Sequence, residues 1–132
     1  MNQFTLLQNQ INQLSKKFDI NNINNQQELI FDVGRYVGQV VNGVAEGKGI
    51  AYFNDGNRYE GDFRNDKNEG KGIIYYNSGN RYEGDFRNGK KEGKGIFYYN
   101  NGDRMMGDYL NGKPIGKHAV LTKNGEVKTK NY

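Results

Sequence analysis

Residues 58–80 read RYEGDFRNDKNEGKGIIYYNSGN, and residues 81–103 read RYEGDFRNGKKEGKGIFYYNNGD. These two stretches are nearly the same sequence, so the chain repeats with a period of 23 residues. Weaker copies extend the pattern over residues 35–57 and 104–126, and residues 127–132 stand where a fifth copy would begin. A fixed period of this length is typical of an array of identical supersecondary units, each too small to hold a core alone. We therefore expect a chain that works as a surface and not as a catalyst.

The composition fits a thin β array that is rich in turns. Hydrophobic residues make up 34% of the chain and aromatic residues 13%, with ten Tyr, seven Phe and no Trp. Nineteen glycines and a single proline, Pro114, suit strands that must stay hydrogen-bonded. The chain has no cysteine, which excludes disulfides and thiolate metal sites, and no stretch approaches the 18 apolar residues of a membrane span. The N-terminus lacks the pattern of a secretory signal or transit peptide, so we expect a cytoplasmic protein without a cofactor.

The net charge of +4 is unevenly distributed along the chain. Residues 113–132 hold five lysines and one glutamate, so this end accounts for the whole net charge. The repeats themselves are neutral, with acidic and basic residues interleaved. A neutral array gives little counterion release, so we do not expect nucleic-acid binding.

Each repeat is predicted to form a β-hairpin. Asp55-Gly56, Ser78-Gly79, Asn101-Gly102 and Asn124-Gly125 read as two-residue turns between alternating runs. With Ser78-Gly79 as such a turn, Tyr75 pairs with Tyr82, and cross-strand partners share a face. The Glu-Gly-Lys-Gly runs at 46–49, 69–72 and 92–95 would form the opposite loops. The predicted fold is mainly β, an elongated single-layer antiparallel array of about nine strands.

This register gathers an aromatic stripe on one face of the sheet. Its rings would form the protein-binding surface, and they are Tyr52, Tyr59, Phe63, Tyr75, Tyr82, Phe86, Tyr98 and Tyr109. Glycines at positions 38, 61, 84 and 107 would let side chains lie flat over the backbone beneath it. The other face is mixed, and there we expect Arg81 to stack on Tyr76 and Arg104 on Tyr99.

The first 20 residues are predicted to form an amphipathic helix. Its apolar residues follow the 3, 4, 3, 4 spacing of a heptad seam, and they are Phe4, Leu7, Ile11, Leu14 and Phe18. An isolated helix of this length is marginal in water, so it must dock to persist. Docking on its own sheet, docking on another chain, and disorder all stay open. Residues 21–34 form a polar linker followed by a degenerate strand at 28–33.

The repeat resembles the MORN (membrane occupation and recognition nexus) repeat. The resemblance rests on Tyr-Glu-Gly-Asp-Phe, a later Gly-x-Gly, an aromatic pair and a turn glycine, and it covers about residues 35–132. Phe63 and Phe86 stand where the family usually has Trp, and His118 replaces a glycine of the last copy. The resemblance implies an elongated β array that scaffolds, dimerises or holds helical segments of partners. It also implies ciliary or cytoskeletal assemblies, and for some relatives contact with phospholipids.

Enzymatic chemistry finds no support in the sequence. His118 is the only histidine, and repeat degeneracy explains its position better than catalysis does. The carboxylate pairs Glu60/Asp62 and Glu83/Asp85 recur at the repeat period, as a structural charge ladder would. Gly47-Lys48-Gly49 lacks the spacing of a phosphate loop, and Asp55-Gly56-Asn57 lacks that of a calcium loop.

The leading hypothesis is a non-enzymatic scaffold that holds a helical segment of a protein partner on the aromatic stripe. The alternative is peripheral binding to anionic phospholipid through the basic end, with Lys113, Lys117, Lys123, Lys128 and Lys130. Lysines on a terminal strand also shield an open sheet edge from pairing, and we favour that explanation for them. Self-association through the open sheet ends stays open.

Overall fold

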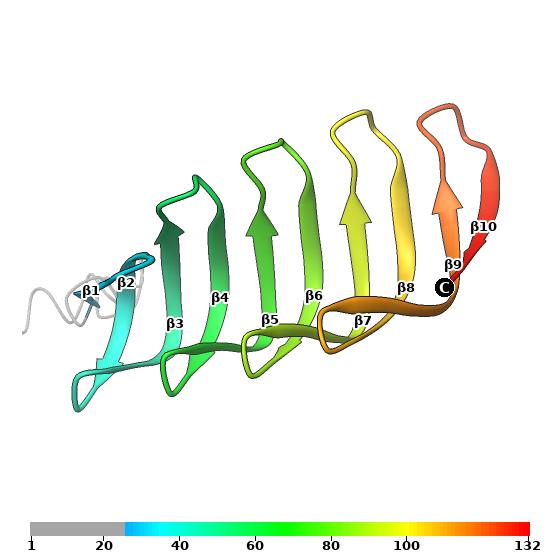
Figure 1. Ribbon diagram of the computed structural model, residues 1–132. Coiled ribbons are helices and arrows are strands. Elements are labelled where there is room, and N and C mark those ends of the chain that lie inside the picture. Colours follow the sequence, from blue (N-terminus) through cyan, green and yellow to red (C-terminus); the bar gives the residue numbers. More distant parts are fainter. Residues whose placement is uncertain (1–25) are drawn as a thin grey trace, which may run out of the picture.

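The computed structural model describes residues 26–132, which form one open antiparallel sheet (Figure 1). The ten strands lie in sequence order, and each is hydrogen-bonded only to its neighbours in the chain. They are β1 (Gln26–Phe31), β2 (Gly34–Val41), β3 (Val44–Phe53), β4 (Arg58–Arg64), β5 (Lys67–Tyr75), β6 (Arg81–Arg87), β7 (Lys90–Tyr98), β8 (Arg104–Leu110), β9 (Lys113–Leu121) and β10 (Val127–Asn131). The predicted single-layer hairpin array is confirmed for this part of the chain. The predicted helix at 1–20, with its docking residues, lies outside the described residues.

Two kinds of turn alternate along the sheet. The lower turns in Figure 1 are tight two-residue turns at Asn42-Gly43, Asn65-Asp66, Asn88-Gly89 and Asn111-Gly112, and both residues of each turn have positive φ. The upper turns after β3, β5, β7 and β9 hold three residues; in the second of them Tyr76 N–H donates to the Asn80 carbonyl and Gly79 N–H to the Tyr76 carbonyl. The Glu-Gly-Lys-Gly runs lie inside β3, β5 and β7, so their prediction as loops was wrong.

The extra residue in each upper turn shifts the register of the sheet. Tyr75 pairs with Arg81, and Ile74 pairs with Tyr82, where the two-residue turn had predicted Tyr75 opposite Tyr82. Because side chains alternate between faces, a shift of one residue moves three of the eight predicted aromatic residues to the other face. We call the face that carries Tyr82 the inner face and the opposite one the outer face.

The sheet bends along a line of β-bulges, which bury its rings although the fold has a single layer. The register shifts between Gly38 and Val40, Gly61 and Phe63, Gly84 and Phe86, and Met106 and Asp108. A bulge bends the strand that carries it. The lower hairpins accordingly turn out of the plane of the upper strand halves, as Figure 1 shows. Aromatic side chains fill the inside of this bend.

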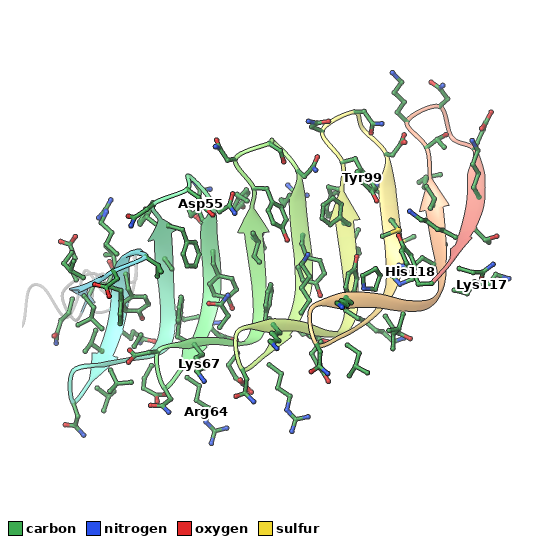
Figure 2. All side chains as sticks on the ribbon, viewed as in Figure 1. Asp55, Arg64, Lys67, Tyr99, Lys117 and His118 are labelled. Carbon is green, nitrogen blue, oxygen red and sulfur yellow. The ribbon has the colours of Figure 1, made fainter. Side chains whose placement is uncertain are left out.

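Side-chain hydrogen bonds join the turns of neighbouring repeats at both edges. In the upper turns the Asn100 amide donates to the Ser78 carbonyl at 2.9 Å. In the lower turns the Asn88 N–H donates to the Glu69 carboxylate at 3.0 Å. Each of these bonds recurs at the repeat period, for example from Asn77 to the Asp55 carbonyl and from Asn111 to Glu92. Figure 2 shows Asp55 in an upper turn and Arg64 and Lys67 flanking a lower one.

Candidate protein-binding surface

A continuous row of rings runs through the inner face from one end of the array to the other. Successive rings meet edge to face, with centroids 4.7 to 5.4 Å apart and interplanar angles of 71° to 89°. In order the rings are Tyr36, Phe63, Tyr59, Phe86, Tyr82, Tyr109, His118 and Tyr132. Edge-to-face contacts of this kind are the preferred geometry of aromatic pairs. Apart from the exposed Tyr132, the ring row forms most of the core of the described residues.

Tyrosines of the ring row lie flat on glycines of the next strand. A Cβ at Gly72 would overlap the Tyr59 ring, so glycine is required there. The Tyr59 hydroxyl donates to the Asp62 carbonyl at 2.8 Å, and Tyr36 and Tyr82 make the same bond three residues ahead. Burial raises the pKa of Tyr36 to about 12 and that of Tyr59 and Tyr82 further. The phenols therefore stay neutral and serve the fold.

In the last full repeat, His118 on β9 fills the place in the ring row that a tyrosine on the preceding strand takes in the other repeats. In the last full repeat Met105 stands at the tyrosine position and His118 at the glycine position. The His118 ring lies over Gly107, and its Nε2 is 2.9 Å from the Asp108 carbonyl, the repeat equivalent of the acceptor of Tyr59. Since Nε2 also faces the Ile115 carbonyl, it carries the proton and donates. His118 is fully buried and takes the place of a tyrosine in the core (Figure 2).

The structure divides the eight predicted binding aromatics between the two faces. Five of them lie in the ring row with at most 6% of their surface exposed, and these are Tyr59, Phe63, Tyr82, Phe86 and Tyr109. The other three, Tyr52, Tyr75 and Tyr98, lie half-buried on the outer face. The prediction of one aromatic stripe was therefore wrong, because it used the two-residue turn register. A binding role for these rings stays a prediction.

On the outer face the three tyrosines alternate with arginines along one row. Arg35 stacks on Tyr52, Arg58 on Tyr75 and Arg81 on Tyr98, with guanidinium carbons 4.1 to 4.3 Å from the ring centroids. Each arginine pairs across the strands with the tyrosine that it covers. Stacking on Tyr76 and Tyr99 was predicted instead, and the one-residue shift in register explains the difference. These contacts stiffen the outer face at each repeat.

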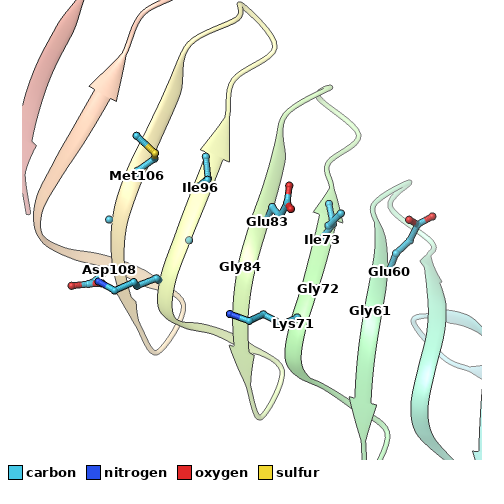
Figure 3. A pocket seen from close by; sticks show the side chains of 13 residues that line it. Glu60, Gly61, Lys71, Gly72, Ile73, Glu83, Gly84, Ile96, Met106 and Asp108 are labelled. Carbon is cyan, nitrogen blue, oxygen red and sulfur yellow. The ribbon is translucent and has the colours of Figure 1, made fainter.

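A row of paired glycines crosses the sheet below these tyrosines. Neighbouring strands from β2 to β8 place glycine opposite glycine, at positions 38, 49, 61, 72, 84, 95 and 107. On the outer face this row is the floor of a trough of about 860 Å³ that spans β4 to β8. Figure 3 shows Gly61, Gly72 and Gly84 in line, with Ile73 and Glu83 on one side and Lys71 on the other. Backbone alone forms the floor, so an occupant can approach the sheet closely.

The two walls of the trough differ in chemistry. The first wall alternates apolar and acidic side chains, Ile73, Ile96 and Met106 with Glu60 and Glu83. The second wall consists of cross-strand ion pairs, in which Lys71 meets Asp85 and Lys94 lies 3.5 Å from Asp108. Met106 keeps 43% of its surface exposed. The trough thus offers an apolar strip with a neutralised wall, which suits an amphipathic segment.

The inner face has less free space because its own side chains fill it. Above the ring row lie Phe53, Ile74, Tyr76 and Phe97, packed against the core, and Tyr99 lies 4.8 Å from Phe97. The ammonium of Lys91 sits among them, 4.9 Å from the Tyr82 centroid and 5.2 Å from that of Tyr76. Loss of solvation lowers the pKa of Lys91, and the rings stabilise its charge. The trough, at about 860 Å³, is therefore larger than the inner-face pocket of about 140 Å³ beside Ala51.

The five C-terminal lysines do not form one surface. All five are exposed. Lys128 and Lys130 pair with Val120 and His118 on the inner face, whereas Lys117 pairs with Asn131 on the outer face. Lys130 lies 5.0 Å from the Tyr132 ring, and Lys128 lies 3.5 Å from Glu126. Within residues 26–132 no helix is long and apolar enough to cross a membrane.

The single layer of hairpins at a 23-residue period defines a β-hairpin repeat protein. The MORN repeat family matches three consecutive stretches, residues 36–58, 59–81 and 82–104. Together they cover more than half of the sequence, and the chain belongs to the MORN repeat family. This family is a non-catalytic repeat family, and its repeats serve in protein–protein or membrane binding in general. No curated protein matches the chain.

Proposed function

We propose that this protein is a non-enzymatic scaffold that holds an α-helical segment of a protein partner in the outer-face trough, as a small subunit of a larger cytoplasmic, cytoskeletal or ciliary assembly. The observation that carries the proposal is the trough itself, which spans five strands on a glycine floor. The predicted site thereby moves from the aromatic stripe to the outer face, where Tyr75 and Tyr98 lie one row above its apolar wall. The assembly and its location are proposed by analogy with other proteins that carry such repeats.

The spacing of the trough suits a helix that lies across the strands. Ile73 and Ile96 are one repeat apart, and one repeat advances the array by two strands, which is about 9.6 Å. Seven residues of an α-helix rise about 10.5 Å. Two apolar residues of a helix that are seven positions apart can therefore meet both isoleucines of the trough. An extended chain has no such match, since its side chains on one face recur every two residues.

Site-specific photo-crosslinking tests the proposal. A benzophenone amino acid is placed at Ile96, in the trough, or at the neighbouring Phe97, on the inner face, and the full chain is irradiated in an extract of its source cells. We expect crosslinks to one defined protein segment from position 96 and not from position 97. A synthetic peptide of that segment should gain helical circular dichroism when it is mixed with the protein. Crosslinking from position 97 alone, or a bound peptide without helix, would contradict the proposal.

The alternative function is binding to anionic phospholipid through the five lysines, whose exposure favours it. Because electrostatic attachment decays over a Debye length of about 8 Å at physiological salt, vesicle sedimentation should then fall steeply as salt increases. Replacing all five lysines by Gln should abolish the sedimentation. We expect little sedimentation at physiological salt, because the lysines lie on both faces of the sheet. Strong sedimentation that depends on these lysines would favour the lipid function over the scaffold.

A further inference from the structure

We propose that residues 4–18 of the same chain occupy the trough as an amphipathic helix, so that a partner must displace them. The inference rests on the proposed function, because it concerns the regulation of that same trough. Three observations carry it: where the chain enters the sheet, the spacing of the apolar residues, and the charge of the two surfaces.

The described chain begins at the end of the glycine row. Gln27 of β1 pairs with Gly38, which pairs with Gly49, and the glycine row continues from there to Gly107. The residues before Gln26 therefore leave the sheet level with the trough floor. From Phe18 to Gln26 the chain has eight steps, which span up to about 26 Å. From β1 to β4 the distance is three strands, about 14 Å, so the segment can reach the trough.

The apolar residues of the segment have the period of the trough. Phe4, Ile11 and Phe18 are seven residues apart, with Leu7 and Leu14 between them on the same helical face. Phe18 and Ile11, one heptad apart, would meet Ile73 and Ile96 of the apolar wall, and Leu7, four residues before Ile11, would meet Met106, which lies one strand beyond Ile96. The mismatch between about 10.5 Å and about 9.6 Å is about 1 Å over the heptad, which side-chain rotamers absorb.

The charges of segment and trough are of opposite sign. Residues 1–18 hold Lys16 and Lys17 and no acidic residue. In the trough, Asp85 and Asp108 are paired with lysines and Glu60 with Arg58, whereas Glu83 has no ion-pair partner within residues 26–132. The uncompensated charge of the trough is therefore negative. If the same segment docked on the inner face instead, it would offer no negative charge to Lys91, because residues 1–18 hold no acidic residue.

Engineered disulfides test this docking in the full chain. The natural chain has no cysteine, so two introduced cysteines are the only thiols present. Ile11→Cys is combined with Ile73→Cys or Ile96→Cys in the trough. The matched control combines Ile11→Cys with Ile74→Cys, which is equally half-buried but faces inward. A second control pairs Asn9→Cys, on the polar side of the predicted helix, with Ile73→Cys. Disulfide formation is followed at low protein concentration by non-reducing electrophoresis and mass spectrometry.

We expect at least one trough pair to form an intramolecular disulfide at least tenfold faster than either control. Equal rates in the trough pairs and the controls would overturn the inference, and so would disulfide-linked dimers, which would show docking on a second copy. The oxidised chain should also lose photo-crosslinking from a probe at position 96 and regain it on reduction. If the locked chain still captures the partner there, the segment does not regulate the trough. Failure of partner capture in every form, with the disulfide intact, would instead refute the proposed function.

Discussion

Tyr109 differs from the phenylalanines at the same position of the earlier repeats by one hydroxyl group. It stands at the repeat position of Phe63 and Phe86, and its buried hydroxyl has no hydrogen-bond partner among the described residues. The hydroxyl of Tyr82, in contrast, donates to the Asp85 carbonyl at 3.2 Å. An unsatisfied buried polar group costs free energy, whereas a satisfied one contributes about 1 kcal/mol.

Replacing each tyrosine by Phe should therefore have opposite effects. We expect Tyr109→Phe to leave the free energy of unfolding unchanged or to raise it by about 1 kcal/mol, and Tyr82→Phe to lower it by about 1 kcal/mol. Urea denaturation followed by circular dichroism measures both. If Tyr109→Phe destabilises the protein as much as Tyr82→Phe, the Tyr109 hydroxyl has a partner that the described contacts omit.

Met105 and His118 should be coupled, because together they replace one Tyr–Gly pair. His118→Gly alone removes a buried ring and should cost about 3 kcal/mol, and Met105→Tyr alone should cost about 2 kcal/mol since the new ring overlaps His118. The double variant recreates the arrangement of Tyr82 on Gly95 and should lie within about 1 kcal/mol of the natural protein. A double-mutant cycle measures the coupling. Additive losses would show that His118 does not substitute for the tyrosine.

At the scale of elements, the repeat period predicted the hairpins. Rings do lie on glycines, but the tyrosines lie on Gly49, Gly72 and Gly95, and of the predicted glycines only Gly107 has a ring, that of His118, over it. The register was wrong for one physical reason. Ser78-Gly79 looks like a two-residue turn, but Gly79 at φ 92° ends a three-residue turn, and the two patterns share the same letters. Asn88-Gly89 and Asn111-Gly112 carried the true type I′ signal, and these dipeptides identify the lower turns in the sequence.

The first repeat leaves space that later repeats fill. Ala51 in β3 stands where β5 has Ile74 and β7 has Phe97, and it lines a pocket of about 140 Å³ with Phe53 and Phe63. We expect Ala51→Ile to raise the free energy of unfolding by about 1 kcal/mol, because it fills this pocket. Thermal denaturation compares it with Ala119→Ile on the outer face, which should change stability by less than about 0.5 kcal/mol. A loss of stability in Ala51→Ile would show that the pocket cannot accept a larger side chain.

At the scale of the whole molecule, the buried phenols make the fold sensitive to alkali. Desolvation raises the pKa of Tyr36 and Tyr109 from 10.0 to about 12. The folded state thus holds these protons more tightly than the unfolded state, and this stabilisation is complete below pH 10. It should decline as the pH rises from 10 towards 12. Circular dichroism and phenolate absorbance, recorded together, should show the buried tyrosines ionising only as the sheet unfolds. Ionisation of all ten tyrosines near pH 10 with the sheet intact would contradict this.

The sequence predicted the candidate site less well than it predicted the fold. Tyr75 and Tyr98 were expected on a binding face with Tyr82, but register alone decides which face each ring joins. The trough depends on glycines of five strands being in register, and no single repeat contains that information. The apolar wall could have been predicted from the sequence, since Ile73 and Ile96 recur at the period of 23.

Because every strand in residues 26–132 is bonded only to its neighbours in sequence, no strand pairing there ties distant repeats together when tension is applied to the two ends. The load falls on the outermost hairpin first, and the turn-to-turn bonds from Asn77 to Asn57 and from Asn100 to Asn80 tie each unit to the next. Pulling should therefore peel the array in steps of 23 residues, each releasing about 75 Å of chain. In an assembly under mechanical load, such a molecule would act as an extensible link that yields one repeat at a time.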